Sequence, residues 1–270
     1  MKFSVITPNW NGERFIEKTI RSVIAQRDEG VDVEYIVVDG GSTDGSIEII
    51  RKLQAHISTF ISEPDRGPAS AINKGLNIAT GDVVAWLNAD DRYHPGALTR
   101  VAEAMAAAPQ AALGFGHCPI VNEDGVEIRK GITRFKEMFF PLSSRFTIQC
   151  INYISQPAAF FRRSAWAAAG PLREDLACAW DYEFILRAWR QGGAVYVGGP
   201  ALASFRWHPN SLSGRLFAIQ FREEWEAARR DAGPWSLQAL IHLFVRWGIV
   251  GSYALMARLA RRGGCDANRR

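Results

Sequence analysis

Apolar residues along the first hundred positions follow two alternating spacings. Four short apolar runs, rich in β-branched residues, are each followed by a stretch in which apolar residues recur every three or four positions. The short runs predict buried strands and the longer stretches predict amphipathic helices. The predicted strands span residues 3–8, 33–40, 59–65 and 82–88, and the helices that follow them span residues 13–26, 47–53, 68–80 and 96–109.

This alternation also predicts the fold class. Strand–helix units in succession are typical of an α/β protein with a mostly parallel, Rossmann-like sheet, flanked by helices and joined by right-handed crossovers. After Pro109 the pattern is less regular. It predicts two strands around a turn at 122–125, a strand leading into a helix within 154–170, a helix at 179–193, and strands within 194–208.

Polar side chains follow each of the four predicted strands at its carboxyl end. These positions are occupied by Asn11, Asp39, Asp65 and the adjacent pair Asp90 and Asp91. In a parallel α/β sheet the carboxyl ends meet at one edge, which is where ligands bind. An ordinary loop acid or helix cap explains any one of these residues. Four such clusters at one edge favour a binding site.

The chemistry of these loops favours a metal and a diphosphate. Adjacent carboxylates at 90 and 91 repel each other, and a bound cation would offset that repulsion. Mg²⁺ and Mn²⁺ prefer oxygen ligands, often one or two carboxylates together with substrate phosphates. The glycine-rich loop at 40–46 lacks the Lys and Ser/Thr of a P-loop, and the first loop, residues 8–12, lacks the glycine spacing of a dinucleotide fold.

Composition restricts the class of protein further. Of the 270 residues, 47% are hydrophobic and 22% are charged, which predicts a packed globular protein. The four cysteines are scattered without a C-x-x-C pair, which favours reduced thiols over a disulfide scaffold or a zinc site. The first apolar run is too short for a signal peptide, so we expect a cytoplasmic protein.

Positive charge is concentrated at the end of the chain. The net charge is +4, and residues 214–270 hold ten arginines and five acidic residues. This distribution indicates a local anionic partner and argues against a uniformly basic nucleic-acid-binding protein.

Four sequence blocks, in order, resemble the family-2 glycosyltransferases with the GT-A fold: VITPNWNG, YIVVDGGSTDGS, SEPDRGPASAINKG and ATGDVVAWLNADD. The resemblance is dense over 3–98 and thinner over 150–213. It implies a GT-A catalytic domain at 1–213, with a nucleotide-binding half at 1–98 and an acceptor half at 99–213. It also implies an inverting, hexosyltransferase-type enzyme of polysaccharide or glycolipid assembly, which moves a sugar from a nucleotide diphosphate to an acceptor hydroxyl.

Matching the family's motifs residue by residue assigns the donor pocket. The resemblance implies that the base and ribose are held by Thr7, Pro8, Asn11, Asp39 and Asp65. Asp39 lies where a family aspartate binds the pyrimidine base, which favours UDP as the nucleotide.

The family's D-x-D element corresponds to the segment from Asn88 to Asp90. The resemblance implies that Asp90 binds the metal, Mn²⁺ or Mg²⁺, with Asn88 and Asp91 on the donor side. Asn88 departs from the family pattern because an amide carries no charge, which lowers the expected metal affinity. The resemblance places His208 near the metal and diphosphate, where a neutral imidazole is a reasonable ligand. An ordinary surface histidine before a proline turn is the alternative.

The acceptor side needs a base, because an inverting transfer requires a carboxylate that takes the proton of the attacking hydroxyl. The resemblance assigns this role to Asp181, although Trp180 stands where the family often has a second acid. Asp181 heads a predicted helix, so an N-cap is the alternative. Gln156 lies in a segment that resembles the family's acceptor-side strand, and we expect it to face the acceptor.

Residues 214–270 are predicted to form a basic helical extension. Within it, the run 237–257 is long and apolar and is followed by arginines, but His242 and Arg246 interrupt it. Three arrangements remain open: a helix on an anionic membrane surface, helices packed on the catalytic domain, and a membrane span. The first implies a peripheral place on the inner face of the membrane and suits a lipid-linked saccharide acceptor.

Two other functions remain open. A nucleotide-sugar-binding accessory protein with weak or absent catalysis would account for Asn88 and Trp180. A nucleotidyltransferase that forms sugar nucleotides also uses a parallel sheet and a metal. Such an enzyme normally has a glycine-rich, basic loop after its first strand, and residues 8–12 do not form one.

Overall fold

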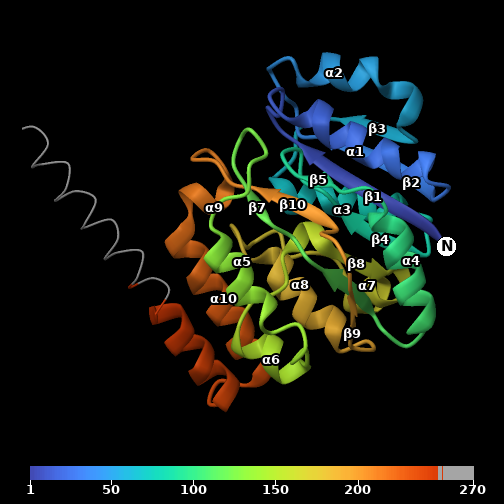
Figure 1. The fold of residues 1–270 in the computed structure, drawn as a ribbon. Helices are drawn as coiled ribbons and strands as arrows, with labels where there is room; N and C mark the ends of the chain where they lie inside the picture. Colours follow the sequence, from blue (N-terminus) through green and yellow to red (C-terminus); the bar gives the residue numbers. More distant parts are fainter. Residues whose placement is uncertain (249–250, 252–270) are drawn as a thin grey trace, which may run out of the picture.

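The computed structural model describes residues 1–248 and 251, and it confirms the predicted α/β architecture (Figure 1). Within these residues a seven-stranded sheet forms the centre, in the order β3-β2-β1-β4-β8-β6-β9. Strand β8 runs antiparallel to both of its neighbours, and the other pairs are parallel. The strands are β1 (Lys2–Asn9), β2 (Asp32–Asp39), β3 (Thr59–Ser62), β4 (Val83–Trp86), β6 (Leu113–Gly116), β8 (Ala159–Arg162) and β9 (Ala194–Val197).

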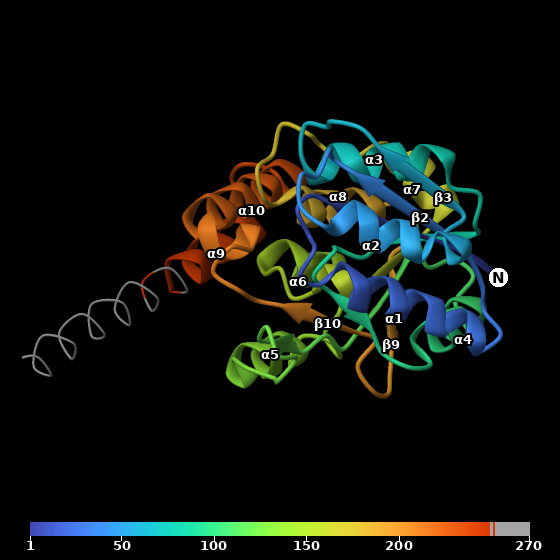
Figure 2. The same cartoon turned by 90° about the horizontal axis from the view of Figure 1, so that it is seen from above.

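Helices cover both faces of this sheet, because its central strands are apolar on both sides (Figure 2). One face packs against α1 (Ile16–Asp28), α2 (Ser46–Lys52) and α4 (Ala97–Ala107). The opposite face packs against α3 (Pro68–Ile78), α7 (Arg163–Ala169) and α8 (Trp180–Trp189). A short 3-10 helix, η1 (Gln54–His56), precedes β3.

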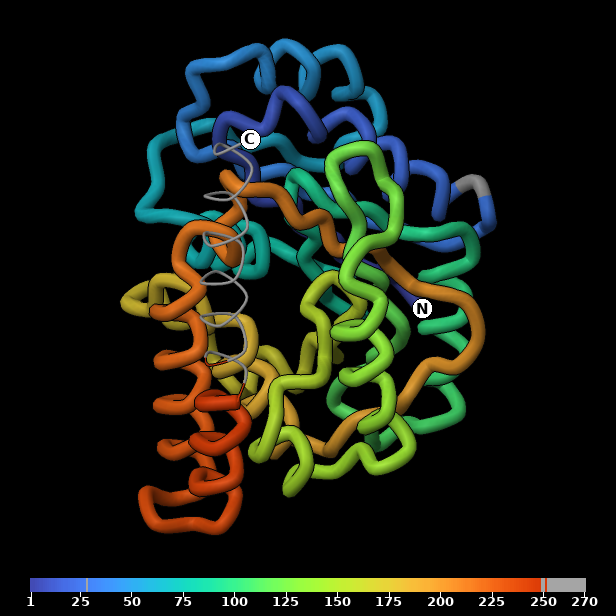
Figure 3. The backbone as a smooth tube through the Cα atoms, turned by 60° about the vertical axis from the view of Figure 1, so that its left-hand side comes forward, coloured from blue at the N-terminus to red at the C-terminus, as the bar shows by residue number. Residues whose placement is uncertain are grey.

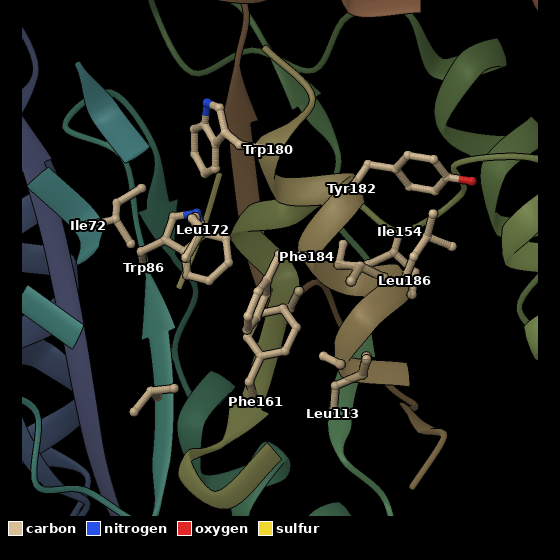
Figure 4. Close-up of a cluster of buried hydrophobic side chains, with 14 of the residues drawn as sticks. Ile72, Trp86, Leu113, Ile154, Phe161, Leu172, Trp180, Tyr182, Phe184 and Leu186 are labelled. Carbon is tan, nitrogen blue, oxygen red and sulfur yellow. The ribbon is translucent and has the colours of Figure 1, made fainter. Parts of the chain in front are cut away.

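A cluster of aromatic rings beneath α8 fixes the end of β4 (Figure 4). Trp86, the last residue of β4, is fully buried and stacks on Phe161 with ring centroids 5.3 Å apart. It also contacts Phe184 edge-on and Trp180 at 6.0 Å. Such a ring cannot move without opening a large cavity, so the backbone that follows Trp86 is held in place. The acidic pair lies only four and five residues further on.

A second, smaller sheet lies beside the first and positions the residues that face the acids. Its order is β5-β10-β7, with β5 (Arg92–Tyr93), β7 (Ile120–Val121) and β10 (Ala203–Arg206). The predicted turn at 122–125 follows β7, but the predicted second strand is reduced to a single bridge between Val121 and Glu127.

The apolar pattern did not predict the helices that come between β7 and β8 along the chain. They are α5 (Lys130–Glu137), α6 (Arg145–Cys150) and the 3-10 helix η2 (Gln156–Ala158). Helix α5 has Ile132 and Phe135 three positions apart, but both are exposed and Thr133 is its only buried residue, so its apolar residues do not form a buried face.

The last part of the described chain consists of helices that pack beside α8 and α6. They are α9 (Leu212–Arg215), α10 (Phe217–Ala232) and a helix over residues 237–248. His242 is buried and its Nδ1 donates to the carbonyl of Gln149, 3.0 Å away. This helix therefore packs on the body of the protein, as one of the three predicted arrangements requires. The later part of the apolar run, apart from residue 251, lies outside the described residues.

Across the part of the chain that the structure describes, no helix is both long and apolar enough to cross a membrane. The domain boundary predicted at residue 213 stays a prediction.

Candidate functional site

The carboxyl ends of β1 and β2 are joined by a buried polar network centred on Asp39. Asn9 donates from Nδ2 to Asp39 Oδ1 at 2.7 Å. The other carboxylate oxygen accepts from the amides of Gly41 and Ser42 and from the hydroxyl of Ser62. Burial alone would raise the pKa of Asp39, but the hydrogen bonds from Ser42, Asn9 and Ser62 outweigh it and lower that pKa. An ionised Asp39 therefore organises the glycine-rich loop at this edge.

Two further predicted residues tie neighbouring loops to the same network. The side-chain oxygen Oδ1 of Asn11 accepts from the backbone amide of Thr43 at 2.9 Å, and the backbone amide of Asn11 donates to Ser42 Oγ at 2.8 Å. Its φ of 51° is left-handed, which asparagine tolerates better than most residues. Asp65 lies against Gly40 so closely that a Cβ there would stand 2.6 Å from Asp65 Oδ2. The loops after β1, β2 and β3 thus converge, as predicted.

Thr7 and Pro8 lie beneath this edge. Both are buried within β1, and Thr7 Oγ1 lies 3.0 Å from the hydroxyl of Tyr35. Trp10, in the loop that follows, is 67% exposed. Thr7 and Pro8 therefore support the loop, and their contacts with a base or ribose stay predictions.

The two adjacent acids at the end of β4 have different surroundings. Asp91 is buried; its Oδ1 accepts from the backbone amide of Arg206 at 2.8 Å, and its Oδ2 accepts from Asn88 Nδ2 at 3.2 Å. Burial, followed by repulsion from Asp90, raises the pKa of Asp91 well above its usual value. Asp90 is partly exposed, and its Oδ2 lies 3.1 Å from His208 Nε2. One acid supports the turn, and the other is presented outward beside a histidine.

Arg206 was not among the predicted site residues, although it holds this turn together. Only 2% of it is exposed, and its Nε donates to the carbonyl of Asp90 at 2.8 Å. Its Nη1 donates to the carbonyls of Asn122 and Glu123, both at 2.7 Å. The guanidinium also lies over the ring of Phe15, 4.7 Å from its centroid. The sequence offered one indication of this role, because Arg206 stands two residues before His208 in the block FRWHPNSLSG.

Asp90 and His208 are the protein groups that fit a divalent metal. Their polar atoms lie 3.1 Å apart and both side chains are partly exposed. No cluster of three or more His, Cys, Asp and Glu side chains suited to a metal occurs among residues 1–248 and 251. Two protein ligands agree with a metal whose remaining positions are filled by substrate phosphates and water. The uncharged amide of Asn88, beside Asp91, agrees with modest metal affinity in the free protein.

Gln156 is joined to the turn that carries the acids, and it is buried. Its Nε2 donates to the carbonyl of Trp86 at 2.7 Å, and its Oε1 accepts from Asn88 Nδ2 at 3.3 Å. Gln156 therefore fixes the orientation of Asn88. Its predicted contact with an acceptor stays a prediction.

Asp181 lies in the first turn of α8, and it does not cap that helix. The N-cap residue is Ala179, and Tyr182 donates its amide to Asp181 Oδ1 at 2.6 Å. Loss of hydration raises the pKa of Asp181 to about 7; the charge of Glu224 adds to the rise, whereas Lys136 opposes it. A carboxyl with such a pKa can exchange a proton near neutral pH, which a general base must do.

A cleft of about 220 Å³ opens between the residues that follow Asp65 and the segment that precedes Asp181. Residues 66–69 form one wall, directly after Asp65, and residues 174–177 with Trp180 form the other. Arg66 and Glu174 form an ion pair across it, with Nη2 and Oε2 2.5 Å apart. Trp180 also contacts Trp86 (Figure 4), so the cleft, Asp181 and the end of β4 belong to one region.

Comparisons with known proteins agree with this geometry. The family model Glycosyl transferase family 2 matches residues 4–168. An uncharacterized glycosyltransferase of Mycobacterium tuberculosis is 34% identical over 188 residues, 68% of each chain. TuaG of Bacillus subtilis, named as a teichuronic acid biosynthesis glycosyltransferase, is 29% identical over 234 residues, 84% of each chain. A Campylobacter jejuni enzyme named GalNAc(5)-diNAcBac-PP-undecaprenol beta-1,3-glucosyltransferase is 34% identical over 126 residues, 45% of this chain and 40% of that one.

Solved structures share the fold. TarS of S. aureus, residues 1–349, in complex with UDP-GlcNAc superposes with a TM-score of 0.69 at 20% identity, over 86% of this chain and 66% of that one. The mannosyltransferase PcManGT of Pyrobaculum calidifontis, in complex with GDP-Man and Mn²⁺, superposes with a TM-score of 0.63 at 18% identity, over 95% and 80%. Both similarities extend beyond the segment matched by the family model.

Proposed function

The chain belongs to glycosyl transferase family 2 and has the GT-A fold, and from this we propose that it is a metal-dependent, inverting glycosyltransferase of the hexosyl type with a UDP-sugar donor. One observation carries the proposal. Asp90, which is paired with His208 and suits a metal and a diphosphate, lies four residues after Trp86; Trp86 contacts Trp180, the neighbour of Asp181, whose pKa of about 7 suits a base. The cleft between residues 66–69 and 174–177 provides space for a sugar.

The residues at the donor edge hold the nucleotide in this proposal. Asn11 and Asp65 lie where the loops converge, and Asp39 keeps the glycine-rich loop in shape for the base. Thr7 and Pro8 support that loop from β1. A divalent metal, Mn²⁺ or Mg²⁺, held at Asp90 and His208 supplies positive charge that offsets the charge of the departing diphosphate.

The acceptor half carries out the proton transfer. Asp181 accepts the proton of the acceptor hydroxyl while that oxygen attacks the anomeric carbon. The attack comes from the face opposite the diphosphate, so the configuration inverts. Gln156 orients Asn88 beside the diphosphate, and Trp180 forms part of the cleft wall next to Asp181.

The acceptor in this proposal is a saccharide, free or carried on a lipid. Support comes from the printed names of two relatives, one for teichuronic acid biosynthesis and one for an undecaprenol-linked saccharide. The same names support a place in polysaccharide or glycolipid assembly. A cytoplasmic protein at the inner face of the membrane would meet both the nucleotide-sugar donor and a lipid-linked saccharide acceptor.

Thermal unfolding tests the donor site. The protein is heated with UDP, GDP, dTDP or CDP, with and without Mn²⁺, since a ligand selective for the native state raises the midpoint. We expect UDP to raise it most, the rise to need metal, and Asp90→Ala to abolish it. A folded protein that responds to no nucleotide would contradict the proposal.

A second variant separates an enzyme from an accessory binding protein. We expect Asp181→Asn to bind UDP and Mn²⁺ as the wild type does, and to lose transfer by about a hundredfold or more. Equal transfer by the variant and the wild type would remove Asp181 from catalysis. Absence of transfer in both, with nucleotide binding intact, would favour the accessory protein.

A further inference from the structure

The helix over residues 237–248 presents an apolar face to solvent. Trp235 is 88% exposed, and Leu237, Leu240, Phe244 and Trp247 are also exposed. The last four recur every three or four positions, so they share one side of the helix. We call these five residues the apolar face. Large exposed apolar surfaces of this kind mark sites of interaction.

The opposite side of this helix is already occupied. Ala239 and His242 are buried, and His242 is hydrogen-bonded to Gln149 at the end of α6. The packing of Ala239 and the hydrogen bond of His242 therefore direct the apolar face away from the protein.

Exposed apolar side chains continue on the neighbouring segment. Met138, Leu142 and Phe146 lie between α5 and the first turn of α6 and are exposed. Helix 237–248 lies beside α6 in both Figure 1 and Figure 3, in agreement with the hydrogen bonds at Gln149. The two segments thus offer apolar side chains from adjacent parts of the fold.

We propose that the apolar face docks the protein on an anionic lipid surface. Three observations favour lipid over a second copy of this chain or a soluble partner. Arg246 is the only Asp, Glu, Lys or Arg among residues 237–248, and two of the five side chains of the apolar face are tryptophans, which favour the interface between lipid and water. The sequence then continues with Arg258, Arg261 and Arg262, which complement anionic headgroups. Only the purpose of this docking rests on the proposed function: it would bring the cleft to a lipid-linked acceptor.

Co-sedimentation with vesicles tests this surface. The full chain is mixed with vesicles of phosphatidylcholine alone or with phosphatidylglycerol added. We expect sedimentation with the anionic vesicles and a loss of roughly tenfold or more in the double variant Phe244→Glu/Trp247→Glu. The matched control is Ile78→Glu, which places a charge at an exposed apolar residue at the end of α3. We expect the control to bind as the wild type does.

Two outcomes would overturn the proposal. One is vesicle binding that the double variant leaves unchanged. The other is a concentration-dependent dimer in solution that the double variant dissociates, since a second copy would then cover the face. The UDP-dependent rise in the unfolding midpoint is measured in the same samples. If the wild type shows no such rise, the proposed donor site is contradicted, and the result for vesicle binding is judged separately.

A separate set of contacts places helix α10 in the catalytic region. Glu223 is buried, and its carboxylate accepts three backbone amides from the segment directly before Asp181. The amide of Ala177 donates to Oε1 at 2.9 Å, and those of Cys178 and Ala179 donate to Oε2 at 2.9 and 3.0 Å. These amides precede the first turn of α8, where helix amides lack partners within the helix. A carboxylate there is favoured by both hydrogen bonding and the helix dipole.

We infer that Glu223 is a positioning residue for Asp181. It fixes the segment 177–179 and with it the start of α8, so it sets where the Asp181 carboxylate stands relative to the cleft. Residues 174–177 also form one wall of that cleft. Helix α10 thereby completes the acceptor half of the proposed site. This inference rests on the proposed role of Asp181.

Glu223→Gln tests the inference against Glu226→Gln, which removes a charge from the solvent side of the same helix. In Glu223→Gln we expect kcat to fall by roughly tenfold or more, with the KM for donor and the affinity for UDP unchanged. The control should retain the wild-type kcat. Equal kcat in both variants would overturn the inference, and so would an equal loss of UDP binding and turnover.

Hydrogen exchange of the wild-type protein provides a readout that does not depend on activity. We expect the amides of residues 177–179 to be protected, because each donates to Glu223. Exchange as fast as in an open loop would overturn the inference even if transfer were never detected. If Glu223→Gln does not fold, Glu223→Asp, which retains the charge but is one methylene shorter, replaces it in the kinetic test.

Discussion

The carboxylates of the site are distinguished by what surrounds each of them. Asp91 is buried under the amide of Arg206, Asp90 is presented beside His208, and Asp181 stands at the start of α8. Identical chemical groups can therefore take separate roles in the proposed function, as support of the turn, metal ligand and base. The sequence placed Asp90 and Asp91 side by side, but only the fold shows which one is buried.

At the residue scale, the first prediction concerns the pH dependence of transfer. Asp181 must be deprotonated to act as a base, and its pKa is about 7, so kcat/KM should rise as the pH increases through about 7. Burial is the main cause of this raised pKa; the charge of Glu224 on α10 raises it further, and Lys136 on α5 lowers it. Glu224→Gln removes the charge that raises this pKa, so the rise should move to lower pH. A pH–rate profile that does not move in Glu224→Gln would contradict this account, and Glu226→Gln is the control.

The same shift predicts how stability depends on pH. The pKa of Asp181 is raised from 3.8 to about 7, so the folded protein holds this proton more tightly than the unfolded chain does. This group therefore lowers stability progressively as the pH rises from about 4 to about 7. Asp181→Asn removes the effect, so its unfolding midpoint should gain on the wild type between pH 5 and pH 8. An equal difference at both pH values would show that Asp181 titrates normally.

At the scale of elements, the sequence predicted best where an element has one buried face. The strands and helices up to residue 107 follow the expected spacings, because each packs an apolar side on the sheet. Helix α5 was missed because it is largely exposed. Arg206 and Glu223 were missed for another reason. Their partners are backbone groups far away in the sequence, and no local pattern records such contacts.

The loop between β2 and α2 provides an element-scale prediction. A Cβ at Gly40 would stand 2.6 Å from Asp65 Oδ2, so Gly40→Ala must displace the Asp65 carboxylate or separate the two loops of the donor edge. We expect UDP affinity to fall by roughly tenfold to a hundredfold, because small displacements of binding groups are costly. Gly131→Ala, where a Cβ meets nothing within 4 Å, is the control. Isothermal titration with UDP and Mn²⁺ measures both. Wild-type affinity in Gly40→Ala would mean that these loops do not hold the nucleotide.

At the scale of the whole molecule, the donor edge, the cleft and the apolar face are formed by successive parts of the chain. The loops after β1 to β4 form the donor edge. Helix α8 carries Asp181, the proposed general base, and α10 contacts the segment before it. Helix 237–248 has its apolar face directed outward beside α6. A chain arranged in this way can bind a nucleotide-sugar from solution on one side while it meets a surface-bound acceptor on another. Charge should then control the second contact without affecting the first.

Removal of residues 258–270 tests that separation. This segment contains five arginines and one aspartate, and each arginine near an anionic surface contributes about 1 kcal/mol. We expect the shortened protein to bind phosphatidylglycerol vesicles roughly tenfold or more weakly, and the wild type to approach that level at high salt because salt screens these charges. The UDP-dependent rise in the unfolding midpoint should be the same for both chains, since the proposed donor and metal residues, Thr7 to Asp91 and His208, are present in both. Vesicle binding that is equal in both chains at low salt would mean that the apolar face acts without help from the arginines.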